Sequence, residues 1–238
     1  MSIPRRFKPG IASSLITLLL FPCLIGLGRW QLHRADEKAQ RFHTFQTRAA
    51  LPELDLPIGD SDFIALEWRR VRGAGHYVAP NILLDNRVRN HRLGYDVFTP
   101  FQFSDGSYLL VARGWVPAGV DRTDVPSLDS PHGDTPIAGF IGAAPWVGIQ
   151  LPAATQTEFF KNDLVRIQRL DLPALSAELK RPLAPYVVYL EPAAPHGYDR
   201  AWPAPVRDVG KHTAYAFQWF AMAAALALIY LKINFRPD

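Results

Sequence analysis

Two long apolar runs lie near the two ends of the chain. Residues 10–28 and residues 213–231 each span 19 positions without a charged side chain. Because a helix rises about 1.5 Å per residue, each run is long enough to cross a hydrocarbon layer of roughly 30 Å. The pattern therefore predicts one transmembrane helix over residues 10–28 and a second over residues 213–231.

The first run can also be interpreted as a signal peptide. Three basic residues precede it, and Gly26-Leu27-Gly28 resembles a small-residue cleavage site. The run is long for a signal peptide, however, and good helix formers continue without a breaker until Pro52. We therefore favour a span that continues directly into an amphipathic helical extension over residues 29–50.

Short β-type segments recur between turn signals from Trp68 onward. Seven segments are predicted as strands, at residues 68–78, 82–88, 94–103, 107–117, 136–144, 164–172 and 186–192. The two glycines of the first segment suggest a β-bulge there. Asp105-Gly106 between two apolar runs is a strong hairpin signal and predicts Gly106 at a positive φ. Residues 173–180 begin with a proline and predict a short helix.

About seven strands with short connections predict an antiparallel sheet or a small barrel. The predicted fold class is therefore a membrane α+β protein, in which two transmembrane helices flank one mainly antiparallel β domain with a short helix. The expected order is a tail over residues 1–9, the first span, the extension over 29–50, the β domain over about 64–191, a proline-rich return segment over 192–211, the second span, and a tail over 232–238.

An even number of spans places both termini on the same side of the membrane. The tail over residues 1–9 carries three basic residues and no acid, which favours the cytoplasm. Residues 29–212 are then expected on the outer side of the membrane.

Composition narrows the function classes. The net charge is +4, and the basic residues are scattered singly among acids, so no nucleic-acid-binding face is expected. Basic residues near the spans suit an anionic lipid bilayer instead. The single cysteine, Cys23, lies inside the first apolar run and leaves no intramolecular disulfide or Cys-based metal site. None of the common catalytic signatures occurs in the sequence, so an enzyme is not expected.

One histidine stands at a special position, directly before the second apolar run. On a helix, His212, Tyr215, Ala216 and Trp219 share one face, at i, i+3, i+4 and i+7. An imidazole beside an aromatic wall, with small Ala216 leaving room, can hold a planar apolar ring, and haem iron takes a histidine ligand in this way. The plainer alternative is an interfacial belt, because His, Tyr and Trp suit the headgroup region.

Two further residues have a functional and a structural interpretation. His33 lies about one turn beyond the first span, so it can stand near His212 as a second iron ligand or be a solvated residue of the helical extension. Arg113-Gly114-Trp115 lies near the end of the predicted strand over residues 107–117. Arg113 can meet an anionic group such as a carboxylate, but a structural salt bridge is the favoured interpretation, and the glycine permits a bulge or a close backbone approach.

Three blocks of the sequence resemble the surfeit locus protein 1 family. The blocks are Gly28-Arg29-Trp30-Gln31-Leu32 with Arg34 and Lys38, then Gly94-Tyr95 through Thr99-Pro100 to Val111-Ala112-Arg113-Gly114-Trp115-Val116-Pro117, and finally His212 with Tyr215-Ala216 and Gln218-Trp219-Phe220. Their order, their spacing and the two-span layout match over nearly the whole chain.

The resemblance implies an assembly factor for cytochrome c oxidase that assists delivery of haem a, or its insertion, into the largest oxidase subunit. That subunit and the haem a synthesis enzyme are the implied partners, and His212 is the implied haem-binding residue, with Tyr215 and Trp219 as its expected aromatic wall. The tail before the first span is too short for a mitochondrial transit peptide, which favours the bacterial inner membrane. A haem-free scaffold for oxidase intermediates is the main alternative, and a membrane-anchored enzyme is a third.

Overall fold

The chain forms two units, which are described separately. A computed structural model describes residues 5–59, 62–119, 121, 126–129, 131–145, 158–160, 163–200, 202, 205 and 209–237. The first unit comprises residues 1–45 and 204–238, and the second comprises residues 46–203. Parts of the predicted N-terminal tail and of the proline-rich return segment lie outside the described residues.

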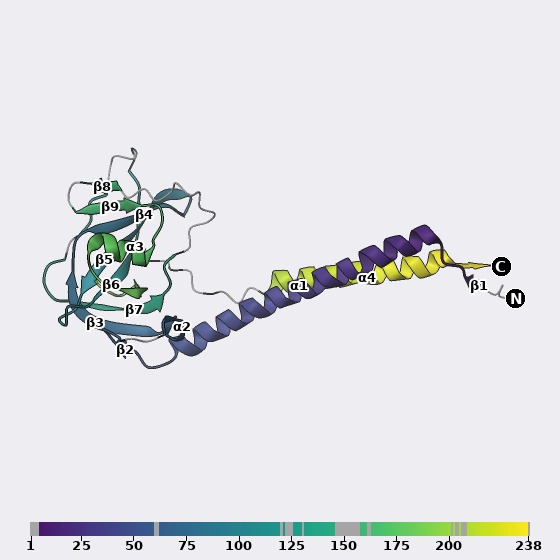
Figure 1. The fold of residues 1–238 in the computed structure, drawn as a ribbon, viewed down its shortest axis with the longest axis horizontal. Helices are drawn as coiled ribbons and strands as arrows, with labels where there is room; N and C mark the ends of the chain where they lie inside the picture. The colour runs from purple at the N-terminus through teal and green to yellow at the C-terminus, as the bar shows by residue number, and fades with distance from the viewer. Residues whose placement is uncertain are drawn as a thin grey trace. The chain divides into compact units, whose positions relative to one another are not determined.

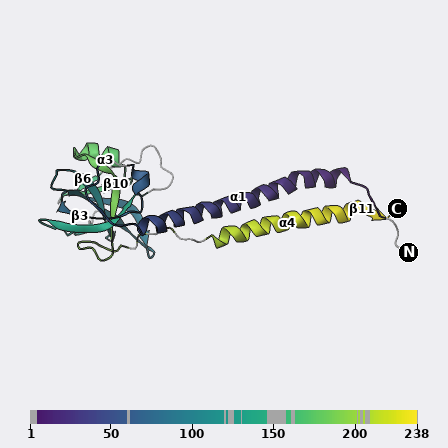
Figure 2. The same ribbon diagram turned by 90° about the horizontal axis from the view of Figure 1, so that it is seen from below.

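Two long helices make up most of the first unit. Helix α1 is Ile11–Ala49, whose last four residues belong to the second unit, and helix α4 is Gly210–Asn234. Figures 1 and 2 both show α1 and α4 side by side. Each is long and apolar enough to cross a membrane. The short strands β1 (Arg5–Phe7) and β11 (Phe235–Pro237) pair antiparallel, which brings the two ends of the chain together.

Small residues lie where the two helices meet. Gly28 and Ala35 of α1 and Ala216 and Ala223 of α4 are buried. A Cβ atom added at Gly28 would lie 2.5 Å from the Phe220 ring, so the glycine is what admits that ring. Membrane helices commonly pack through small residues in this way, because close backbone approach maximises van der Waals contact.

A buried amide ties the helix ends near the termini. Asn234 is fully buried, and its Oδ1 accepts hydrogen bonds from the backbone N–H of Gly10 at 2.8 Å and the hydroxyl of Ser13 at 3.2 Å. Its amide group donates to the backbone carbonyl of Tyr230 at 2.7 Å. The hydroxyls of Ser14 and Tyr230 lie 2.9 Å apart. These bonds fix the pairing of α1 and α4 at this end.

A closed five-stranded β-barrel forms the body of the second unit (Figure 1). Its strands are β3 (Arg70–Tyr77), β7 (Thr135–Gly142), β10 (Leu183–Leu190), β6 (Tyr108–Pro117) and β5 (Arg92–Gln102), in that order around the barrel. Strand β3 closes the ring by pairing with β5 at His76 and Tyr77. The pairing of β10 with β6 is parallel and the other four pairings are antiparallel, so the barrel is mixed.

Further elements extend the barrel at its edges. Strand β2 (Leu54–Asp55) pairs with β3, and strand β4 (Asn81–Arg89) pairs with β5. Strands β9 (Leu164–Ile167) and β8 (Glu158–Phe160) continue the sheet beyond β4. The short helices are α2 (Phe63–Leu66) and α3 (Leu172–Leu179).

Most of the sequence-based expectations for the fold are confirmed. Two long apolar helices flank a β domain, each of the seven predicted segments overlaps a strand, and a short helix follows the sixth strand-forming segment. Gly106 has φ +84° and donates its backbone N–H to Phe103 at 3.0 Å, as the predicted turn requires.

The expected bulge in the first strand is wrong. Strand β3 pairs continuously with β7 from Arg70 to Gly75, and register shifts occur instead in the β4–β5, β5–β6 and β6–β10 pairs. Gly75 serves a different purpose, because a Cβ atom there would lie 2.2 Å from the backbone oxygen of Gln102. The glycine allows the close approach of β3 and β5 that closes the barrel.

Candidate functional site

Helices α1 and α4 bring a glutamine and a histidine together. His212 is partly buried at the start of α4, and its Nδ1 lies 2.8 Å from Oε1 of Gln31 on α1. A neutral imidazole bonded to an amide oxygen in this way carries its proton on Nδ1 and has its lone pair on Nε2. No hydrogen-bond partner of Nε2 occurs among the residues the structure describes. The arrangement therefore orients a histidine with one nitrogen available to a metal ion.

The other residues of the predicted face have different surroundings. Tyr215 is 53% exposed, Trp219 is partly buried, and Ala216 is only 1% exposed. The room that Ala216 was expected to leave is therefore filled by the protein. Of these three side chains, that of Tyr215 is the most exposed.

His33 pairs with a neighbour on its own helix. Its Nδ1 lies 3.2 Å from a carboxylate oxygen of Glu37, and its side chain is 72% exposed. These surroundings match the interpretation of His33 as a solvated residue of the helical extension. Within the described part of the chain, no group of three or more His, Cys, Asp or Glu side chains could hold a metal ion. His33 thus pairs with Glu37 and His212 with Gln31, and no bond between the two histidines occurs among the described residues.

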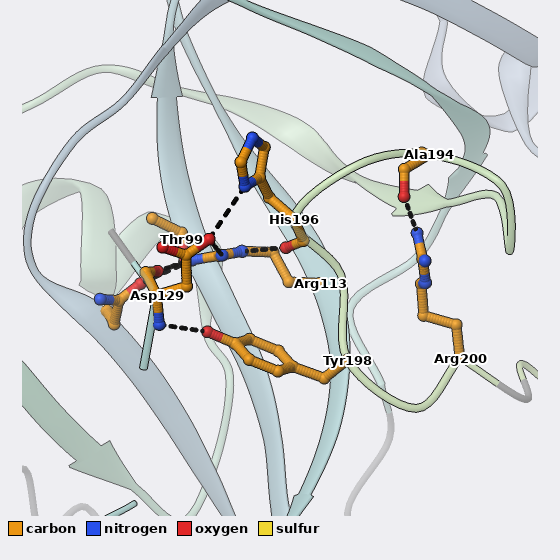
Figure 3. Close-up of polar contacts among 8 residues, drawn as sticks. Thr99, Arg113, Asp129, Ala194, His196, Tyr198 and Arg200 are labelled. Carbon is orange, nitrogen blue, oxygen red and sulfur yellow. Dashed lines mark hydrogen bonds and ion pairs between the residues drawn. The ribbon is translucent and has the colours of Figure 1, made fainter. Parts of the chain in front are cut away.

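Arg113 lies at the centre of a second polar cluster, in the barrel (Figure 3). Its side chain is fully buried, with the guanidinium 4.8 Å from the ring centroid of Tyr77 and 5.0 Å from that of Tyr198. A cation between two aromatic faces is stabilised by their ring quadrupoles. Burial raises the pKa of Tyr77 to about 12 and also raises that of Tyr198, so both rings stay neutral near pH 7.

The same guanidinium joins two irregular segments of the chain. Arg113 Nε donates to the backbone carbonyl of His196 at 2.8 Å, and Nη1 donates to that of Asp129 at 2.8 Å. The Asp129 carboxylate lies 2.9 Å from His196 Nδ1 and 3.9 Å from Arg113 Nη2. The backbone N–H of Asp129 donates to the Tyr198 hydroxyl at 2.9 Å. This is the structural role that the sequence favoured for Arg113, with backbone carbonyls as the main acceptors.

Sequence reasoning did not find the partners of Arg113. Asp129 and His196 lie in irregular segments without periodicity, so no pattern placed them beside β6. Arg200, also seen in Figure 3, shapes the second segment by donating to the carbonyls of Glu191, Pro192 and Ala194 at 2.6 to 2.7 Å. This segment thus folds around the guanidinium of Arg200, and the guanidinium of Arg113 bonds it to the barrel.

Comparison with known proteins decides the family. The model of the SURF1 family matches residues 18–224, which include most of α1, the whole barrel and part of α4. The chain belongs to the SURF1 family. A SURF1-like protein of Rickettsia bellii is 28% identical over 231 residues, which cover 92% of this chain and 89% of that protein. A SURF1-like protein of Rickettsia felis is 27% identical over 235 residues, covering 92% and 95%.

Mammalian relatives match over a shorter stretch. Surfeit locus protein 1 of Mus musculus is 32% identical over 117 residues, which cover 42% of this chain and 38% of the mouse protein. The three sequence blocks that resemble this family are also where the contacts above occur. The first and third blocks meet through Gly28 with Phe220 and Gln31 with His212, and the second block contains Arg113.

Proposed function

We propose that this SURF1-family protein is a membrane-anchored assembly factor for cytochrome c oxidase that assists delivery or insertion of haem a into the largest oxidase subunit. Family membership and the two apolar helices support this role. The observation that carries the haem part is the bond between His212 Nδ1 and Gln31 Oε1, which leaves Nε2 able to ligate iron. No enzymatic step is part of the proposal.

The position of His212 suits a cargo with an apolar ring and charged substituents. The histidine lies where the charged residue Lys211 gives way to the uncharged run of α4. A ring bound there would bury its apolar face against the helix, beside the exposed ring of Tyr215, and keep charged propionates in water. A single histidine ligand would also favour release, which a carrier needs, over the permanent hold of two ligands.

The absorption spectrum of the full-length protein tests this function. Protein purified from cells that make haem a should show a haem band, and His212→Ala should lose the band while still accumulating in the membrane. Trp219→Ala should weaken haem retention without changing the type of spectrum. His33→Ala is the matched control and should change little, because His33 pairs with Glu37. Full haem occupancy in His212→Ala would refute the ligand assignment.

A haem-free scaffold that stabilises oxidase assembly intermediates is the second candidate. The burial of Ala216 favours it, because the space predicted for a ring is partly filled. In this case the purified protein would be colourless, and His212→Ala would still recover oxidase subunits during co-purification.

We further propose that the membrane is the bacterial inner membrane. In this proposal residues 10–28 and 213–231 are the spans, residues 29–212 are periplasmic, and the tails at 1–9 and 232–238 are cytoplasmic. Topology reporters fused after Gly133 should be active only as periplasmic reporters, and those fused after Asp238 only as cytoplasmic ones. The opposite activities, or a mature protein that begins at Arg29, would overturn the two-span arrangement.

A further inference from the structure

A second site lies in the barrel unit, apart from both His212 and Arg113. It is a pocket of about 610 Å³, a volume within the range of small-molecule sites, about 300–1,000 Å³. Strands β4, β5, β6, β7 and β10 all contribute side chains to it. Five aromatic side chains form much of its wall: Trp68, Trp115, Phe140, Tyr189 and Trp202.

Four of these rings form a continuous row. Trp68 stacks on Phe140 with centroids 5.8 Å apart and planes 25° apart, and Phe140 stacks on Tyr189 at 5.4 Å and 10°. Trp202 completes the row with an edge contact to Tyr189 at 4.9 Å. The row gives the pocket a continuous wall of ring carbons.

Three of the aromatic side chains have their polar ends bonded within the protein. Trp115 and Trp202 donate their indole N–H groups to backbone carbonyls at 3.0 and 2.9 Å, and Tyr189 donates its hydroxyl to another at 2.7 Å. These bonds fix the orientation of the three rings. Because these polar atoms are occupied, the three rings can offer a ligand only aromatic and apolar contact.

The charged groups that line the pocket are either paired in salt bridges or balanced by groups of opposite charge. Arg87 pairs with the buried Asp96 at 2.6 Å, and Arg89 pairs with Asp199 at 2.9 Å. The lining residue Glu67 adds a carboxylate, which disfavours an anionic ligand, while the two arginines disfavour a cation. An uncharged ligand meets neither penalty.

Backbone features hold the rings in place. Trp68 has φ +70°, a left-handed conformation that is costly for a bulky residue and is retained only where the surroundings enforce it. At Gly142 a Cβ atom would lie 2.6 Å from the Tyr189 ring, so the absence of a side chain lets that ring lie against β7. Strain and close approach of this kind commonly mark preorganised binding sites.

We propose that this pocket binds an uncharged, planar aromatic molecule, which makes edge-to-face and apolar contacts with the row of rings. The site is independent of the haem proposal. No His, Cys or Met is among the described residues that line it, and the Tyr189 hydroxyl is bonded to the backbone. The pocket therefore offers no ready axial ligand to haem iron.

Fluorine NMR of the full-length chain in lipid nanodiscs tests the proposal, with 5-fluorotryptophan as the label and 2-naphthol as the neutral probe. The signals of Trp68, Trp115 and Trp202 should shift saturably, while those of Trp30 and Trp219 in the helices should not. Phe140→Leu should weaken binding about fivefold, because the ring in the middle of the row is lost and its two neighbours lose their stacking partner. Phe140→Tyr keeps the ring and should bind within about twofold of the natural chain.

Phe217→Leu is the matched control, because Phe217 is 74% exposed on α4 and lies outside the pocket. It should leave the affinity for 2-naphthol unchanged. Shifts that grow without saturation at all tryptophans alike would mean partition into lipid and would overturn the proposal. Tighter binding of the anion 2-naphthoate, or of an acetylated Gly-Trp-Gly amide, would also overturn it, in favour of an anion site or a peptide site.

Discussion

Gln31 Oε1 accepts a hydrogen bond from the Nδ1–H of His212 at 2.8 Å, although the two residues are 181 positions apart in the sequence. Bonds of this kind set the tautomer and orientation of metal-ligating histidines, and their loss typically costs about 10–100-fold in metal affinity. If His212 ligates haem, Gln31→Leu should lower haem occupancy by about tenfold or more in a titration of the purified protein.

Two further variants separate this effect from a general disturbance of α1. Gln31→Glu keeps an acceptor for Nδ1 and should retain haem. Gln40→Leu alters an exposed glutamine on the same helix and should have no effect. Equal haem occupancy in Gln31→Leu and Gln40→Leu would mean that Gln31 does not position the ligand.

Gly28 is expected to control the packing of α1 against α4. Leucine at this position would collide with the Phe220 ring, because even a Cβ atom lies 2.5 Å from it. Gly28→Leu should lower the temperature at which the helical circular dichroism signal of the full chain is lost. Gly26→Leu is the control and should be tolerated, because nothing lies within 4 Å of its added Cβ atom. Addition of Phe220→Ala to Gly28→Leu should restore part of the loss, and purely additive effects would contradict the contact.

The β5–β6 turn depends on Gly106. Its φ of +84° is accessible to glycine at almost no cost but strains a β-branched residue, so Gly106→Val should destabilise the domain by roughly 1 kcal/mol or more. The urea midpoint of tryptophan fluorescence measures this change. Gly59→Val is a suitable control, because its added Cβ atom meets nothing within 4 Å and its φ lies outside the left-handed region. Equal midpoints for the two variants would contradict the turn geometry.

Local patterns predicted the elements of this fold because each pattern reports on a few neighbouring residues. The predicted strands at 94–103 and 107–117 and their turn at Gly106 follow from two apolar runs and the Asp-Gly pair between them. Barrel closure does not follow in the same way. It depends on β3 pairing with β5 at His76 and Tyr77, and on the parallel contact of β10 with β6. Such pairings are set by the whole sheet.

For the candidate site, too, local patterns predicted single residues but not the distant residues that they contact. The position of His212 before an apolar run marked it as special, but helical periodicity does not tell which element a face meets. Ala216 was expected to leave room for a ring and is instead buried, and Gln31 gave no signal as the partner of His212. Arg113 stood out at a strand end, yet its acceptors come from segments without any repeating pattern.

Arg113 is expected to be a major source of stability in the barrel. Arg113→Met removes two charge-assisted hydrogen bonds to backbone carbonyls and the cation between Tyr77 and Tyr198, which should cost about 2–4 kcal/mol. Arg113→Lys should recover little, because an ammonium lacks the planar fork that reaches both carbonyls. Denaturant unfolding followed by fluorescence measures both variants.

Arg72 provides the comparison for an ordinary surface pair. Its bond to Asp55 at 2.8 Å joins two exposed side chains, so Arg72→Met should lower stability much less than Arg113→Met. An Arg113→Met variant no less stable than Arg72→Met would show that the buried cluster contributes nothing beyond a surface salt bridge.

Alkaline pH should weaken the barrel through its buried tyrosines. Burial raises the pKa of Tyr77 to about 12 in the folded chain, against about 10 for an exposed phenol, and it also raises the pKa values of Tyr186, Tyr189 and Tyr198. The folded chain therefore holds more protons than the unfolded chain above about pH 10, and its stability should fall as the pH rises from about 10 to about 12. Below about pH 10 these groups should cause no pH dependence.

Tyr77→Phe removes one such phenol, so its urea midpoint should fall less steeply over this window than that of the natural chain. Tyr198→Phe should flatten the slope in the same direction, although loss of its bond from Asp129 lowers stability at every pH. The slopes are therefore compared rather than the absolute midpoints, and identical slopes in all three proteins would show that burial does not hold these phenols neutral.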